Sequence, residues 1–237
     1  MTENLYVQGY LAYWDAIIER YPGIYMDSCA SGGGRNDIES MRRGVPFLRS
    51  DFDRSTTAIR LSQTASFCKW IPFHGSATKE TLGQLESEAG RGASPYAARV
   101  SLLPIMNYNM QFVQNPEIDY ALFHRNLAEW ESVKHLLTKD LYVLTPWHHH
   151  EDKTGWTALA YDDPAIGESL LLGFRMEDCE EETYTAKLPF AEAGQRYTLT
   201  DADTGKTQTL EGGALAAGVV LTAKEKKTSI LIRITRE

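Results

Sequence analysis

Apolar residues in the first 140 positions recur mostly at helical spacing. The first such stretch lies near the N-terminus and contains seven apolar residues: Leu5, Tyr6, Tyr10, Leu11, Trp14, Ile17 and Ile18. Pro22 and Gly23 follow it and are typical of a helix end. The same spacing predicts four more helices, over residues 38–44, 54–68, 96–104 and 117–138.

Short apolar runs separate these predicted helices. They cover residues 23–27, 45–51, 69–76 and 104–113, and each one is short enough to be a buried strand. Strands that alternate with helices along the chain predict βα units and a parallel sheet. The first 145 residues are therefore expected to form an α/β region.

The pattern changes after residue 156. Apolar and polar residues alternate in short runs rich in Thr, Val, Ile and Tyr, and turn residues separate the runs. Asp203, Thr204 and Gly205 are typical of a hairpin turn. These features predict an antiparallel β-sandwich over residues 156–237, joined to the α/β region by a linker over residues 146–155.

The predicted α/β region holds only four βα units. Four units are half of a (β/α)₈ TIM barrel, and half a barrel leaves open sheet edges and an uncovered core. We therefore expect residues 1–145 to be the C-terminal half of such a barrel, with the upstream strands outside this sequence. The open edges predict either a homo-oligomer or association with the missing barrel half.

Composition and charge narrow the possible functions. The 237 residues are 43% hydrophobic and 24% charged, as in globular proteins with a substantial core, and the net charge is -8. This charge argues against a nucleic-acid partner. No apolar run approaches the roughly 20 residues that span a bilayer, and the first residues lack the features of an export signal. Three widely spaced cysteines favour reduced thiols in a cytoplasmic protein.

The most unusual stretch is "YMDSCASGGGRNDIESMRRGVPFLRSDFD", residues 25–53. Its glycines would let the backbone approach a bound ligand, because no Cβ intrudes. A phosphate cradle is one alternative, but the Lys-Ser/Thr of a P-loop is missing and "GGGRND" is not G-x-G-x-x-G. A tight strand-to-helix turn is another alternative. Asp51 follows a predicted strand, where barrel enzymes keep catalytic groups, although it could instead cap the helix that begins near Arg54.

Within this stretch, "DSCASGGGRND…PFLRSDFD" resembles the C-S-x-G-G-G-R-F-D and W-T-S-D motifs of glycoside hydrolase family 36. This family comprises retaining α-galactosidases and related α-N-acetylgalactosaminidases. The interval between the cysteine and the aspartate matches, and "DLYVL" (140–144) resembles the family's D-L-Y-R-L, which closes its barrel before a C-terminal β domain. The resemblance covers the whole chain as the C-terminal half of that architecture.

The resemblance implies a function and a site. Asp51 matches the acid/base aspartate at the end of the sixth barrel strand, in an enzyme that cleaves terminal α-linked galactose from a galactoside or related oligosaccharide. The resemblance implies no metal and no organic cofactor. It also implies that five residues line the sugar pocket: Cys29, Ser31, Gly32, Gly33 and Leu48. Arg35 is expected to pair with a neighbouring carboxylate.

The sequence departs from the family in two ways. The K-W-D-x-N motif that carries the nucleophile is absent, so the chain is expected to lack half of the catalytic machinery. Leu48 and Arg49 stand where the family has tryptophan and threonine, which would remove a stacking surface and add a cation to the pocket. An α-N-acetylgalactosaminidase-like specificity therefore remains an alternative, as does an inactive remnant that binds a sugar or a protein partner.

Two further features of the sequence concern a possible metal site and a possible sugar contact. "PWHHHEDK" (146–153) offers imidazole and carboxylate ligands for a metal, but adjacent histidines are expected to point in different directions. We therefore interpret His148, His149 and His150 as part of a solvated linker. Trp70, in the third predicted strand and before its end, is the one tryptophan expected near a sugar.

Overall fold

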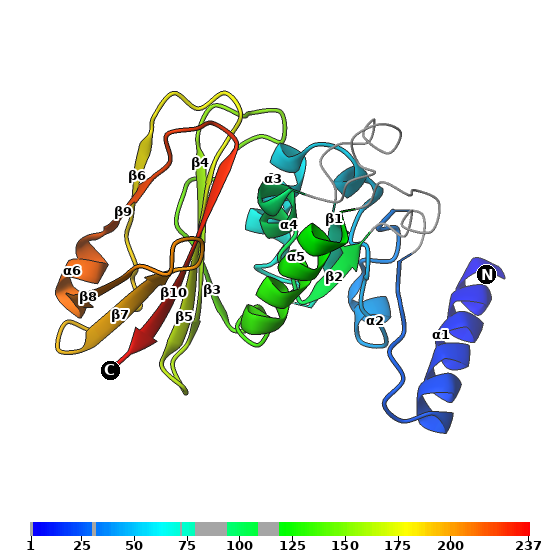
Figure 1. Ribbon diagram of the computed structural model, residues 1–237. Coiled ribbons are helices and arrows are strands. Elements are labelled where there is room, and N and C mark those ends of the chain that lie inside the picture. Colours follow the sequence, from blue (N-terminus) through cyan, green and yellow to red (C-terminus); the bar gives the residue numbers. More distant parts are fainter. Residues whose placement is uncertain (1, 30–31, 72, 79–93, 109–118) are drawn as a thin grey trace.

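The computed structural model describes residues 2–29, 32–71, 73–78, 94–108 and 119–237. Figure 1 shows a region with most of the helices, from blue to green, and a β-rich region from green to red, with helices α3, α4 and α5 between the large sheet and the short strands β1 and β2. No helix among the described residues combines the length and the apolar character needed to cross a membrane.

Six of the helices lie in the first 133 residues: α1 (Thr2–Arg20), α2 (Ile38–Met41), the 3₁₀ helix η1 (Asp51–Arg54), α3 (Thr57–Phe67), α4 (Pro95–Val100) and α5 (Tyr120–Val133). A polar side chain caps the N-terminus of several of these helices. Asp37 caps α2 as predicted, since its carboxylate accepts from the Ser40 amide, and Thr56 and Asp119 cap α3 and α5 in the same way. These caps fix where each helix starts.

Extended segments that follow one another in the chain lie parallel. Strands β1 (Gly75–Thr78) and β2 (Ile105–Tyr108) pair in parallel register, and Asp27 forms a parallel bridge with Val45. The Arg49 amide donates to the Gly75 carbonyl at 3.1 Å, which joins the second segment to β1. The described segments thus have the parallel order of βα units. A barrel is not visible in them.

The observed strands of this region are shorter than the apolar runs that predicted them. Residues 23–27 and 45–51 contribute one bridge instead of full strands, and the strand expected over 69–76 begins only at Gly75. The reason for the second shift is local, because the Cys68, Lys69 and Trp70 amides still donate to carbonyls of α3 and so continue the helical turn. The run over residues 23–27 is also mostly exposed, with Ile24 at 46% and Tyr25 at 73%, so the prediction of a buried strand there is wrong.

The antiparallel β domain predicted from the sequence is confirmed. Its six-stranded sheet has the order β3 (Asp140–Val143), β4 (Trp156–Asp163), β5 (Glu168–Arg175), β10 (Thr228–Arg236), β7 (Arg196–Asp201), β8 (Thr207–Glu211). A second sheet pairs β6 (Thr183–Ala186) with β9 (Val219–Thr222), and the helix α6 (Gly212–Ala217) precedes β9. The predicted hairpin turn joins β7 to β8, where the Asp201 amide donates to the Lys206 carbonyl.

The sheet begins earlier than the sequence predicted. Strand β3 pairs antiparallel with β4 and forms one edge of the six-stranded sheet, although residues 140–143 were expected to belong to the α/β region. Leu141 and Val143 pack against the buried cluster between this sheet and the helices. That cluster serves both regions, so the pattern of apolar residues could not assign β3 to one of them.

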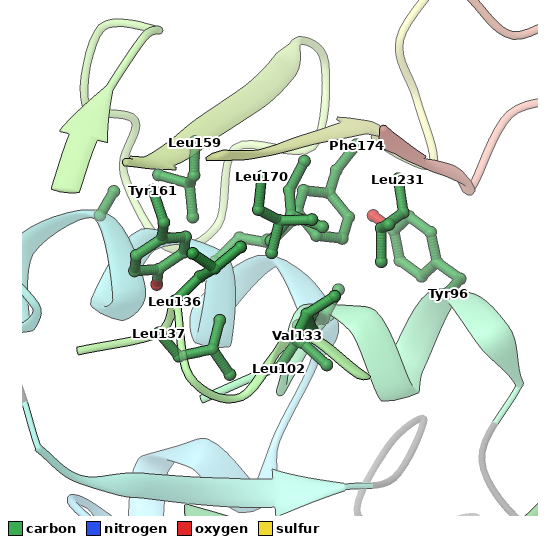
Figure 2. Packing of buried hydrophobic residues seen from close by; sticks show 14 of the residues in the cluster. Tyr96, Leu102, Val133, Leu136, Leu137, Leu159, Tyr161, Leu170, Phe174 and Leu231 are labelled. Carbon is green, nitrogen blue, oxygen red and sulfur yellow. The ribbon is translucent and has the colours of Figure 1, made fainter. Parts of the chain in front are cut away.

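Two apolar clusters cover the two faces of the large sheet. Figure 2 shows the first, in which Leu159, Leu170 and Phe174 of the sheet meet Val133, the last residue of α5, and Leu136 after it. The second cluster lies between the same sheet and strands β6 and β9 and includes Leu171, Leu199 and Leu221. Because neighbouring residues of a strand point to opposite faces, Leu170 of β5 joins the first cluster and Leu171 the second, so the middle of this strand is apolar on both faces.

A buried arginine joins the helices to the sheet. The Arg99 guanidinium in α4 donates to both carboxylate oxygens of Glu129 in α5 and to both of Asp203 in the β7–β8 turn. The hydrogen bonds from Arg99 lower the pKa of Asp203. One charged group therefore fixes two helices against the β domain.

Candidate functional site

The glycine loop packs directly against Asp51. Gly32 and Gly33 have φ values of +68° and +101°, a backbone region that favours glycine. A Cβ on Gly32 would lie 2.6 Å from Asp51 Oδ2, and a Cβ on Gly33 would lie 2.7 Å from the Arg49 carbonyl oxygen. Glycine is thus required at both positions for two reasons: the backbone conformation of the turn, and the close approach of Asp51 and the Arg49 carbonyl. The approach brings the Asp51 carboxylate over the loop.

Side-chain hydrogen bonds hold this loop against the neighbouring segment. Asn36 Nδ2 donates to the Arg49 carbonyl at 2.9 Å. Asp27 Oδ1 accepts from the Cys29 amide at 2.9 Å and from the Phe47 amide at 3.1 Å. The ends of two neighbouring parallel segments are therefore fixed by Asn36 and Asp27, on either side of the glycines.

Asp51 is the first residue of η1 and is exposed. Ser50 caps this 3₁₀ helix, because its hydroxyl accepts from the Phe52 amide, and Thr56 caps the next helix. The alternative role for Asp51, capping the helix that follows, is therefore wrong. Its carboxylate lies at the end of a parallel segment, next to backbone that only glycine allows.

The other predicted pocket residues have different positions. Cys29 is partly exposed beside Asp27, and Gly32 and Gly33 form the turn under Asp51. Leu48 is only 7% exposed, so most of its surface contacts protein. Ser31 lies outside the described residues. The assignment of these five to a sugar pocket stays a prediction.

Arg49 does not enter the pocket, which corrects the expectation of an added cation. Its guanidinium forms two hydrogen bonds with Asp53, at 2.7 and 3.1 Å, and both side chains are 0% exposed. It also donates to the Thr64 hydroxyl and the Arg60 carbonyl. Thr64 and Arg60 belong to α3, so Arg49 faces that helix.

This buried pair also positions Asp51. Arg49 and Asp53 are the two ends of the turn that contains Ser50, Asp51 and Phe52, and their hydrogen bonds fix the spacing between those ends. The sequence analysis missed the pair. An arginine and an aspartate four residues apart can indicate an ion pair, although this spacing is usually taken as evidence only on a continuous helix.

A second buried polar group lies close by. Cys68 Sγ is 3.2 Å from His74 Nε2, and the pair is electrostatically coupled to Tyr161 of β4. Burial raises the pKa of Cys68 to about 11 and, together with the charge of Arg49, lowers that of His74 to about 3. Both groups are neutral at physiological pH, so the pair is structural and lacks the thiolate that a cysteine nucleophile needs.

Two neighbouring residues have contacts that the sequence did not predict. The Arg35 guanidinium lies over the Tyr10 ring at 4.8 Å, and the expected ion pair is not found among contacts between described residues. Trp70 is 56% exposed and stacks on Phe67 in the turn that precedes β1.

The histidine run is more ordered than the predicted linker. His148 bridges Ser62 of α3 and Thr157 of β4, with hydrogen bonds of 2.9 and 3.1 Å. The His150 ring contacts Phe52, the residue after Asp51, at a centroid distance of 5.1 Å. The segment therefore packs between the β domain and the turn that carries Asp51.

The packing around Gly32 gives a testable prediction. Gly32→Ala should lower the free energy of unfolding by more than the about 1–2 kcal/mol that a left-handed backbone costs alanine, because the new Cβ also displaces Asp51. Gly205→Ala is the matched control, since Gly205 has φ +69° and nothing within 4 Å of its Cβ position. Urea denaturation measures both. Equal losses would show that Asp51 does not press on Gly32.

Comparisons with known proteins agree with this fold. No protein-family model matches the sequence, and no curated protein matches it. Among solved structures, the galactosidase domain of the alpha-galactosidase–sucrose kinase AgaSK aligns with 95% of this chain at a TM-score of 0.70 and 16% identity. The GH36 alpha-galactosidases AgaB and AgaA from Geobacillus stearothermophilus each align with 94% of it, at TM-scores of 0.72 and 0.71 and identities of 19% and 20%.

The alignments cover little of those proteins. The chain spans 31% of the AgaSK chain and 30% of the AgaB and AgaA chains. The resemblance stated from the sequence is thus confirmed as a likeness of fold to about a third of each family 36 structure.

Proposed function

We propose that this chain, which has the fold of the C-terminal region of family 36 α-galactosidases, is the acid/base-bearing half of a retaining glycosidase that cleaves terminal α-linked galactose. The observation that carries the proposal is the position of Asp51. Its carboxylate lies over Gly32, at the end of a parallel segment, between the hydrogen-bonded ends of the Arg49–Asp53 turn. The Asp51 side chain is exposed at this position.

A retaining glycosidase needs two carboxyl groups about 5–5.5 Å apart. One attacks the anomeric carbon, and the other protonates the leaving oxygen and then activates the water that releases the sugar. Asp51 takes the second role in this proposal. The chain has no K-W-D-x-N motif, so the nucleophile comes from outside this sequence. The proposed reaction uses no metal and no organic cofactor.

The environment that an acid catalyst needs also depends on the missing half. Carboxyl groups keep a proton near neutral pH when they are partly desolvated and close to another carboxylate. Asp51 is exposed in this chain, and a covering domain that brings the nucleophile would supply both conditions. The proposal therefore expects no hydrolysis by this chain alone.

The parallel segments support the half-barrel interpretation. In this proposal the segments around Asp27 and Val45 are strands five and six, and β1 and β2 are strands seven and eight. Seven of the exposed large apolar residues lie in α1 and the segment after it: Leu5, Tyr6, Val7, Tyr13, Tyr21, Ile24 and Tyr25. Apolar surface of this extent is typical of an interface, and Figure 1 places α1 at the edge of the molecule.

The substrate follows from the corrected position of Arg49. A cation in the pocket was the reason to consider α-N-acetylgalactosaminide, and Arg49 is buried in an ion pair instead. We therefore keep galactose as the substrate, with Cys29, Ser31, Gly32, Gly33 and Leu48 as the proposed pocket residues.

Reconstitution tests the proposal. This chain is to be co-expressed with a protein that carries the first four strands of a family 36 barrel and its K-W-D-x-N motif. We expect a stable complex that hydrolyses nitrophenyl α-galactoside, whereas each half alone does not. Stable complexes without hydrolysis, together with measurable galactose binding by this chain, would contradict the enzyme and indicate a binding module.

A further inference from the structure

His149, His150 and Glu151 form a compact group between β3 and β4. One potential ligand atom from each of the three lies within 4.8 Å of the other two. The two imidazole rings are in contact, with centroids 3.9 Å apart and their planes tilted by 38°, and His149 Nδ1 is 3.9 Å from Glu151 Oε2. The expectation that adjacent histidines would point in different directions is therefore wrong for this pair.

His148 holds the start of this turn. Its Nδ1 is 3.0 Å from the His149 carbonyl, and because a carbonyl only accepts, Nδ1 carries the proton. Its Nε2 then accepts from the Thr157 hydroxyl at 3.1 Å. Both ring nitrogens are engaged, so His148 anchors the turn and leaves ligation to its neighbours.

The end of the turn is held as well. The Asp152 amide donates to the His149 carbonyl at 2.9 Å. The Asp152 carboxylate accepts from the Thr154 amide and hydroxyl at 2.9 and 2.7 Å. The backbone that carries the group is thus fixed on both sides before any ligand binds.

Two imidazoles and one carboxylate are a donor set for zinc and similar divalent ions. Around tetrahedral zinc, neighbouring ligand atoms lie roughly 3.3 Å apart. The group would have to contract, and the exposed side chains of His149 and Glu151 are free to rotate, at 55% and 81% exposure. Among the contacts of the described residues, the Glu151 amide, 3.4 Å from His149 Nδ1, would compete with a metal ion for the lone pair of that nitrogen.

We propose that His149, His150 and Glu151 bind a divalent transition-metal ion such as Zn²⁺, with a water molecule in the fourth position. Calcium and magnesium are excluded as the favoured ions, because they prefer sites built from oxygen ligands. The His150 ring also packs on Phe52, so a bound ion joins the β3–β4 connection to the turn that carries Asp51. This site is independent of the proposed glycosidase function.

Isothermal titration calorimetry of the tag-free chain with Zn²⁺ tests the site. We expect one ion per chain and a loss of affinity of more than about tenfold in His149→Ala and in His150→Ala, since even groups outside the ligand shell contribute 10- to 100-fold. His135→Ala is the matched control, because His135 is also exposed and pairs with a single carboxylate, Glu168, at 2.9 Å.

The possible results separate clearly. Saturable binding that both variants weaken and His135→Ala leaves unchanged supports the site. The absence of saturable binding would overturn it, and so would equal affinity in all four proteins. Circular dichroism of each variant before titration ensures that a loss reflects ligands and not unfolding.

Discussion

Asp51→Asn should lower hydrolysis of substrates with poor leaving groups by roughly 10²-fold or more in the reconstituted enzyme, the scale of general acid catalysis. Asparagine keeps the shape of the side chain over Gly32 but has no proton to give to the departing oxygen. The measurement is kcat/KM for an alkyl α-galactoside, whose leaving oxygen needs that proton.

The same variant contains its own control. Nitrophenyl leaving groups depart with little protonation, so the first step with nitrophenyl α-galactoside should fall less than the step with the alkyl substrate. Asp178→Asn changes an exposed carboxylate of the β domain and should alter neither rate. An Asp51→Asn enzyme with unchanged turnover of the alkyl substrate would refute the assignment.

Asp53→Ala should lower the free energy of unfolding by about 3–5 kcal/mol, because it leaves the Arg49 charge buried without a partner. Both side chains are 0% exposed, and the carboxylate accepts two hydrogen bonds from the guanidinium. Urea denaturation of the isolated chain, monitored by tryptophan fluorescence, gives the value.

Two further variants decide how that loss is read. Glu131→Ala removes the exposed partner of Lys134 and should cost at most about 1 kcal/mol. Replacing both buried charges together, with Arg49→Met and Asp53→Leu, should recover much of the stability, because no uncompensated charge remains. If Asp53→Ala costs no more than Glu131→Ala, the pair does not fix the turn that carries Asp51.

The sequence predicted most of the local structure because the signals for it are local. Helical spacing acts within a few residues, and the structure has a helix over part of each of the predicted ranges 38–44, 54–68, 96–104 and 117–138. The alternation of the β runs likewise depends only on which residues face a core. The glycines were predicted to let the backbone approach a ligand, which stays a prediction, whereas their close approach to Asp51 and to the Arg49 carbonyl was not predicted.

The rest depends on contacts between distant segments. Strand β3 joins the large sheet because β4 lies beside it, which no pattern within residues 140–143 reveals. Arg49 was expected in the pocket because its position in the motif was known and its partner Asp53 was not. The contact between the His149 and His150 rings depends on the hydrogen bonds that hold His148 to α3 and β4. The partners in those elements lie outside the histidine segment, so the sequence of the segment does not reveal them.

A crystal structure of the reconstituted enzyme with bound galactose tests the central claim most directly. The account predicts that the Asp51 carboxyl faces the anomeric side of the ring, about 5–5.5 Å from the nucleophilic carboxylate of the other half. A separation of about 6.5–9.5 Å, which belongs to inverting enzymes, or an Asp51 side chain that does not face the sugar, would contradict it.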